Sequence, residues 1–191
     1  TGEAILNDKR DTFTLNIQDD DPLITLTSSD DSYKENTSKT PYFTVSLSAP
    51  SNKTISIPYK RIGDAAYGSS KDYTLNDASP ITIAAGDTSK RINADIINDS
   101  TDEYTEDFGM KLLAPTSGGG ILSTGSGGVT INIVDDDSPP TVSFSSTKTL
   151  NKTENKTSVT VELELSKASQ RDITVDLDVY GTARRYVQNF F

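Results

Sequence analysis

Residues 129–137 read Val-Thr-Ile-Asn-Ile-Val-Asp-Asp-Asp, the clearest indication of fold in the sequence. Apolar side chains at every second position are typical of a half-buried β-strand, and three consecutive aspartates end it. The same pattern stands at 13–21 as Phe-Thr-Leu-Asn-Ile-Gln-Asp-Asp-Asp, and a proline follows each copy, Pro22 directly and Pro139 after one serine. The recurrence indicates an internal repeat of about 116 residues, the distance from Asp19 to Asp135.

The similarity continues beyond each aspartate triplet. Residues 24–29, Ile-Thr-Leu-Thr-Ser-Ser, correspond to 142–146, Val-Ser-Phe-Ser-Ser. Further on, 34–36 matches 153–155, 45–48 matches the end of 162–166, and 54–57 matches 172–175. We therefore expect three parts: residues 1–21 as the C-terminal end of one repeat, 22–138 as a complete domain, and 139–191 as the N-terminal part of a following repeat.

The complete repeat is patterned for strands. Apolar residues alternate with polar ones around 43–47, 55–59, 92–96, 108–112 and 129–133. Turn-forming clusters such as 49–52, 84–87 and 117–120 interrupt them, and we expect the glycine-rich run 117–128 to be the hairpin loop between the last two strands. About seven short strands at this spacing predict an all-β fold, an immunoglobulin-like antiparallel β-sandwich in tandem repeats.

Composition excludes several functions. The chain has 191 residues, a formal net charge of -10, and neither cysteine nor histidine. The acidic balance argues against nucleic acid as a partner, because phosphate contacts need clustered lysines and arginines. Without thiolate or imidazole, a metal site can offer only oxygen ligands, and the usual zinc and nucleophilic sites are absent. No apolar run approaches the roughly 20 residues of a membrane span.

Two acidic clusters point to a cation. The first is the aspartate triplet, and the second is the run 95–107, in which a strand leads into a carboxylate-rich turn. Adjacent carboxylates repel one another unless something neutralises them. Calcium is the expected ion, since it accepts six to eight oxygen ligands in loose geometry. The run is not an EF-hand loop, because no glycine stands at the sixth position from Asn98 or Asp99.

The spacing of these residues resembles a known family. Residues 96–99, Ile-Ile-Asn-Asp, stand before Glu103, Glu106 and Phe108, and 133–137, Ile-Val-Asp-Asp-Asp, follow. With Glu35 and the segment 71–73, Lys-Asp-Tyr, upstream, this combination resembles the Calx-β pattern of sodium/calcium exchangers and adhesion proteins. The segment 178–183, Asp-Val-Tyr-Gly-Thr-Ala, is similar to the family's Gly-Thr-Ala segment.

The resemblance implies a calcium cluster at one end of the sandwich. The positions that match the family's ligands are Glu35, Asp72, Asp99, Glu103, Asp135, Asp136 and Asp137. Asn98 stands where a binding member usually has aspartate, which removes one anionic ligand, and Gly63-Asp64 replaces the usual Gly-Thr. In the following repeat Glu154 matches, whereas Asn189 replaces the expected aspartate.

These expectations favour a non-catalytic, calcium-binding segment of a long extracellular or cell-surface adhesion protein. Its partners would be calcium ions, the adjacent repeats and a protein or glycan at a cell surface, and calcium would stiffen the modules and their junctions. One alternative is a cytosolic calcium-sensing module of a membrane transporter, and another is a module accessory to a secreted enzyme that contacts polysaccharide. Because the chain opens at Thr1 without a methionine or signal peptide, we expect a middle section of a longer protein.

Overall fold

The computed structural model describes residues 14–16, 21–125, 127–145, 160–178 and 180–181. Within this part of the chain every regular element is a β-strand, so the all-β prediction is confirmed. The chain divides into two compact units, residues 1–98 with 105–134 and residues 99–104 with 135–191. The described residues contain no helix long and apolar enough to cross a membrane. The predicted boundaries at 21 and 138 remain a prediction.

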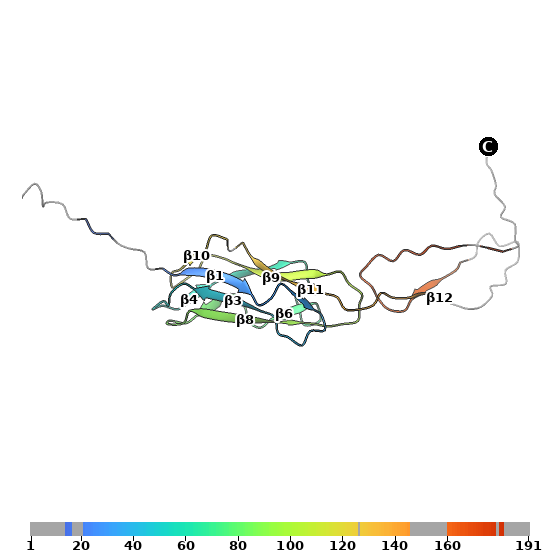
Figure 1. Cartoon of the computed structure of the whole chain (residues 1–191), viewed down its shortest axis with the longest axis horizontal. Coiled ribbons are helices and arrows are strands. Elements are labelled where there is room, and N and C mark those ends of the chain that lie inside the picture. Colours follow the sequence, from blue (N-terminus) through green and yellow to red (C-terminus); the bar gives the residue numbers. More distant parts are fainter. Residues whose placement is uncertain (1–13, 17–20, 126, 146–159, 179, 182–191) are drawn as a thin grey trace, which may run out of the picture. The chain divides into compact units, whose positions relative to one another are not determined.

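Unit 1 contains eleven of the strands in its described part. They are β1 (Leu23–Ser28), β2 (Ser32–Lys34), β3 (Tyr42–Leu47), β4 (Ile55–Ile57), β5 (Tyr59–Gly63), β6 (Tyr73–Leu75), β7 (Ile81–Ile83), β8 (Ser89–Ile96), β9 (Glu106–Leu112), β10 (Ile121–Leu122) and β11 (Val129–Val134). A five-stranded sheet has the order β10-β1-β3-β8-β6, and a four-stranded sheet has the order β2-β11-β9-β5 (Figure 1). The strands β4 and β7 pair separately.

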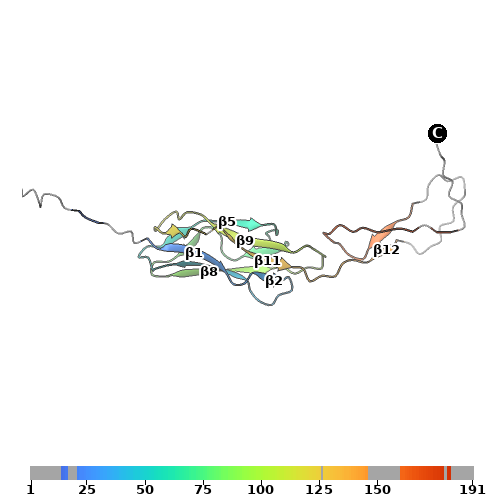
Figure 2. The same ribbon diagram turned by 45° about the horizontal axis from the view of Figure 1, so that its top comes forward.

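The two larger sheets form the layers of a sandwich (Figure 2). Alternation places one face of each strand inside, as in β3, where Phe43, Val45 and Leu47 are buried and the residues between them are half-buried. Aromatic rings join the layers: Phe108 of the four-stranded sheet stacks on Tyr73 of the five-stranded sheet with ring centroids 4.4 Å apart. The edge of Phe43 meets Phe108 at 5.8 Å. The core thus lies between the sheets.

Pro58 divides a stretch that alternation predicts as one strand. Residues 55–57 pair with β7, whereas residues 59–63 pair with β9, so the chain changes sheets at the proline. Pro58 has no N–H to donate, and its carbonyl accepts a hydrogen bond from Leu113 N–H at 2.8 Å. Apolar spacing alone does not show where a strand leaves one sheet for another.

The glycine-rich run is more than a loop. It connects β9 and β11, which are antiparallel neighbours, as the sequence predicts. Within it, however, Ile121 and Leu122 form β10 and pair in parallel with Leu23 and Ile24 of β1. Gly120 allows this approach, because it has a φ of 101° and an added Cβ would stand 2.9 Å from the Ile24 side chain. The antiparallel sandwich therefore has a parallel pairing at this edge.

In unit 2 the described strands are β12 (Val142–Phe144) and β13 (Leu163–Leu165), which pair antiparallel. Val142 is paired with Leu165, just as Ile24 of β1 is paired with Leu47 of β3. The sequence correspondence between repeats is therefore reproduced as the same strand pairing. The predicted matches at Glu154 and Asn189, and two residues of the first triplet, Asp19 and Asp20, lie outside the described residues.

Candidate metal centre

The predicted ligands lie next in the sequence to strands of unit 1 whose ends meet at one end of the sandwich. Tyr73 begins β6 and is paired with Ile96, the last residue of β8. Its ring stacks on Phe108, which is paired with Ile131 near the end of β11. The ends of β8 and β11 and the starts of β6 and β9 are thereby gathered together.

Glu35 is placed by the pairing of β2 with β11. These strands run in parallel, and the Glu35 N–H extends the ladder by donating to Val134 O at 3.0 Å. Only 4% of Glu35 is exposed. Burial of an ionised carboxylate is costly unless hydrogen bonds or cations compensate it, and a bound cation would contribute such compensation here.

Asp72 has a structural task in the loop before β6. Its carbonyl accepts the Ile97 N–H at 2.9 Å, and its carboxylate Oδ2 accepts the Ala66 N–H. The Asp72 N–H in turn donates to Ala66 O at 3.1 Å. These bonds tie the 66–72 loop to the end of β8, and one carboxylate oxygen of Asp72 is engaged in the loop.

The substituted pair Gly63-Asp64 forms the turn that follows β5. Gly63 has a φ of 103°, and a Cβ there would stand 2.2 Å from the carbonyl oxygen of Asp107, so glycine is required. The Asp64 Oδ1 accepts the Asp107 N–H at 2.8 Å. This hydrogen bond favours the ionised form and lowers the pKa of the exposed Asp64 carboxyl. Asp64 thus anchors the start of β9 through the backbone.

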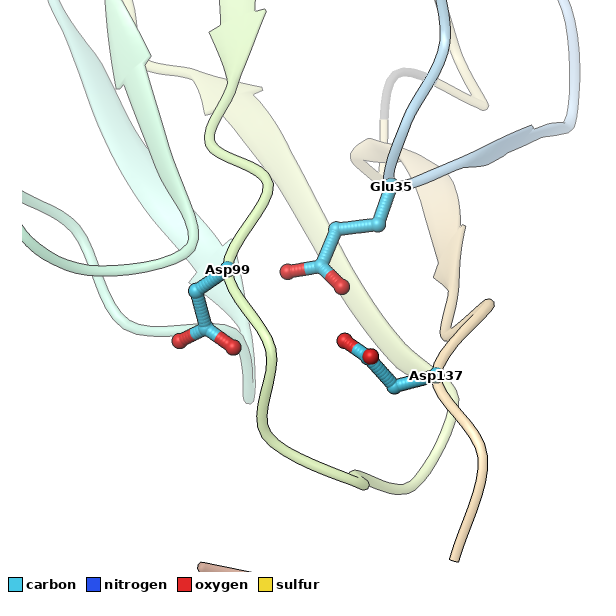
Figure 3. Close-up of side chains that lie close together, drawn as sticks. All are labelled: Glu35, Asp99 and Asp137. Atoms are coloured by element: carbon cyan, nitrogen blue, oxygen red, sulfur yellow. The ribbon is translucent and has the colours of Figure 1, made fainter. Parts of the chain in front are cut away.

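Three predicted ligands come together. Glu35, Asp99 and Asp137 each offer a carboxylate oxygen, and these oxygens lie within 4.8 Å of one another (Figure 3). Asp99 lies three residues beyond the end of β8, and Asp137 three residues beyond the end of β11. The Asp99 Oδ1 accepts the Thr101 N–H at 2.6 Å, which fixes the turn that presents the carboxylate.

The other two members of the triplet differ in exposure. The side chain of Asp135 is only 6% exposed, and its Oδ1 accepts the Asp137 N–H at 3.2 Å. This bond orients the backbone between them. Asp136 is exposed to solvent. Asp135 and Asp136 do not belong to the group of three oxygens, and Asp72 and Glu103 do not belong to it either.

Basic residues of 167–171 approach the same acidic segments within unit 2. Lys167 Nζ lies 3.0 Å from Asp137 Oδ1 and 2.9 Å from the Ser100 carbonyl oxygen. Arg171 lies 3.2 Å from an oxygen of Asp102 and 3.6 Å from one of Asp135. Two cations therefore balance part of the negative charge that gathers in residues 99–104 and 135–137.

Polar contacts extend this arrangement to Glu103. The Gln170 side-chain amide donates to the Glu103 carboxylate, and the Arg171 guanidinium donates to the Glu103 carbonyl. Glu103 is only 7% exposed. Its predicted role as a ligand remains a prediction, since its carboxylate engages a neutral amide.

Asp102 is the residue that the sequence did not single out. It is 2% exposed, pairs with Arg171, and accepts a hydrogen bond from the Ser169 hydroxyl at 2.8 Å. The basic residues Lys167 and Arg171 indicate that some acidic side chain needs them as partners. Their spacing in the sequence does not show which acidic residue they face.

The donor chemistry fits a calcium ion. The three grouped side chains offer only carboxylate oxygens, the ligands that this hard cation prefers. Their separation of at most 4.8 Å suits oxygens that share one ion with ligand distances of about 2.3–2.6 Å. Glu35, Asp99 and Asp137 would hold the ion, and backbone carbonyls or water would complete six to eight ligands.

These features define a class: a β-sandwich module with carboxylates grouped at the end of its strands. The Calx-beta domain model matches residues 18–137 and 135–187, in two adjacent copies, and the chain belongs to this family of calcium-binding domains. No match was found among curated proteins.

The chain is also similar to solved structures. CBD12 from CALX1.2 is 21% identical with a TM-score of 0.45, over 59% of this chain and 44% of that one. The apo form of the Calx CBD1 domain is 22% identical with a TM-score of 0.44, over 60% and 98%. The E. coli chaperone DraB is 9% identical with a TM-score of 0.35, over 60% and 56%. This chain therefore spans less than half of CBD12.

Proposed function

We propose that the chain is a non-catalytic, calcium-binding segment of a longer extracellular or cell-surface adhesion protein built from tandem repeats. The proposal of calcium binding rests on the grouping of carboxylate oxygens of Glu35, Asp99 and Asp137 within 4.8 Å of one another. Membership of the Calx-beta family and its two adjacent copies support the tandem part.

The acidic residues would couple the ion to order in the chain. In its absence the grouped carboxylates repel one another, and the turns that carry Asp99 and Asp137 bear this repulsion. A bound calcium ion supplies two positive charges that remove it. Glu35 is buried beside β11, so it would hold the rigid side of the site while the two turns close on it.

The position of Asp137 extends this effect to the junction between repeats. Residues 135–141 connect β11 with β12 and include Pro139 and Pro140. A ligand within this short connection would restrict its motion when the ion is bound. We therefore expect calcium to stiffen the string of repeats.

The absence of catalysis is supported by the same chemistry. The sequence has no histidine or cysteine to act as base or nucleophile. Grouped oxygens within 4.8 Å are closer than the roughly 6.5–9.5 Å of inverting glycosidases and the roughly 5–5.5 Å of retaining ones. Shared binding of one cation is the better use of these side chains.

X-ray scattering of the whole chain in calcium and in chelator tests the stiffening. We expect a narrower distribution of lengths in calcium, and no such change in a Glu35→Gln variant. Equal flexibility in both conditions, with calcium binding shown by calorimetry, would leave a calcium module but refute its mechanical role. Protease accessibility of the native protein on intact cells tests the location: protection from protease would favour a cytosolic regulatory module instead.

A further inference from the structure

A pocket on unit 1 differs in charge from the rest of this acidic chain. It has a volume of about 530 Å³ and is lined by Tyr59, Lys60, Arg61, Tyr67, Ala78 and Ser79. Its lining contains two cations and no carboxylate. The volume lies within the range of about 300–1,000 Å³ that small-ligand sites occupy.

Arg61 is held in place by an aromatic ring. Its guanidinium carbon lies 3.9 Å from the centroid of Tyr67, whose ring meets that of Tyr73 edge-on at 5.5 Å. Stacking covers one face of the guanidinium but leaves the N–H donors in its plane available. Since Tyr73 is buried, Tyr67 packs against the core, and its ring supports one face of the Arg61 guanidinium.

The cations here lack anionic partners in the described part of the chain. No carboxylate there lies within 4.0 Å of the charged nitrogens of Lys60, Arg61 or Lys111, although the net charge is -10. Lys60 and Lys111 stand directly opposite each other on β5 and β9. Like charges at such positions destabilise a sheet, which adds to the excess of positive charge on this strand pair.

The opposite wall of the pocket is also fixed. Ser79 Oγ accepts the Tyr59 N–H at 3.0 Å, and the Tyr59 hydroxyl donates to the Asp77 carbonyl at 2.7 Å. The 77–79 loop is therefore tied to β5. The Ser79 hydroxyl hydrogen remains available to donate, so donors stand on both sides of the pocket.

The edge of β5 favours a compact ligand over an added peptide strand. Pro58 offers no N–H, the Tyr59 N–H is already bound by Ser79, and Gly63 leaves the extended conformation with a φ of 103°. Arg61 is the residue between them whose backbone faces away from β9, as the alternation of the ladder requires. One residue is too short an edge for stable strand addition.

We propose that this pocket binds the carboxylate of an acidic sugar, with the Arg61 guanidinium as its planar partner. Lys60 adds a second positive charge, and Ser79 offers a donor to a sugar hydroxyl. A stacked guanidinium forms paired hydrogen bonds with a carboxylate, which gives the site its preference for uronic acids over neutral sugars.

Digalacturonic acid, with neutral galactobiose as its counterpart, tests the site by amide chemical-shift titration of the whole chain. We expect a dissociation constant on the order of millimolar for the acid, with shifts at residues 60–67 and 78–79, and no saturation with galactobiose. Arg61→Gln should weaken binding about ten-fold or more. The matched control is Arg91→Gln, because Arg91 also stacks on a tyrosine, Tyr42, at 3.7 Å but belongs to the other sheet.

Several results would overturn this assignment. Absence of binding, equal binding of galactobiose, or equal effects of the two arginine substitutions would each do so. Tighter binding of an acidic peptide than of the sugar acid would refute the ligand class. Repeating the titration with chelator present separates this pocket from the metal centre. Binding of digalacturonic acid should persist in chelator, whether or not the chain binds calcium. Thermal unfolding of each variant must match the unaltered chain, so Lys60→Gln serves as a second test if Arg61→Gln is destabilised.

Discussion

The grouped carboxylates should have two effects on stability: they repel one another without calcium, and they bind the ion when it is present. Replacing Glu35 by glutamine should separate these effects. Oxygens within 4.8 Å of one another repel by about 3.5 kcal/mol per pair at an effective dielectric of 20. Lys167 beside Asp137 and the surrounding water reduce this repulsion. We therefore expect Glu35→Gln to stabilise the chain in chelator by about 1–2 kcal/mol, because it removes a buried charge without changing shape.

In calcium the advantage of the Glu35→Gln variant over the unaltered chain should shrink or reverse, because the unaltered chain gains more stability from binding the ion. A free calcium concentration 100 times the dissociation constant stabilises the unaltered domain by about 2.7 kcal/mol, which raises its melting temperature by about 10 °C. Removing a direct ligand should weaken binding by at least about ten-fold, as loss of even an outer-shell partner does. At the same calcium concentration the variant would then gain about 1.4 kcal/mol or less, roughly half the shift.

Scanning calorimetry of both proteins, with chelator and with calcium, provides the four melting temperatures. The control is Asp87→Asn, which makes the same charge change in the exposed turn before β8, away from the end that carries Asp99. It should leave the calcium shift intact. An equal calcium shift in Glu35→Gln and the unaltered chain would refute the assignment of Glu35 as a ligand.

Three further outcomes follow from the packing and charges. Phe108→Ala should cost about 3–5 kcal/mol in urea unfolding, since its fully buried ring joins the two sheets, and a cost below about 1 kcal/mol would contradict that role. Burial raises the pKa of the Tyr73 hydroxyl above 10.0, so its contribution to stability is complete below pH 10 and is lost as the pH rises beyond it; urea midpoints from neutral to alkaline pH, compared with Tyr73→Phe, measure this. Lys167→Gln should tighten calcium binding by up to about five-fold in calorimetric titration, because the ammonium competes for Asp137, and weaker binding would show that it supports the site instead.

The fold was accessible from the sequence because alternation is a local signal. Each predicted run around Phe43, Ile92, Phe108 and Ile131 is a strand with those residues inside. What alternation does not encode is the partner of a strand. The change of sheets at Pro58 and the parallel pairing of β10 depend on distant segments, so they were missed.

The candidate site was accessible only in part, for a similar reason. Repetition and acidity indicated the segments that contain Asp99 and Asp137, and the family resemblance added Glu35; oxygens of these three lie within 4.8 Å of one another, and their role as ligands stays a prediction. Acidity alone does not indicate that basic side chains of the same chain neutralise some of these carboxylates. Ion pairs with Arg171 and Lys167 involve residues that are more than 29 positions away along the chain, and no local pattern predicts such contacts.

The contacts of residues 99–104 with 167–171 bear on where this polypeptide should be cut for study. A recombinant product that stops at 138 would retain every strand of the sandwich yet lose both basic side chains that face Asp102, Asp135 and Asp137. Its acidic turns would meet calcium with a more negative local potential. Affinities measured on a single excised repeat should consequently exceed those of the same repeat when its C-terminal neighbour is attached.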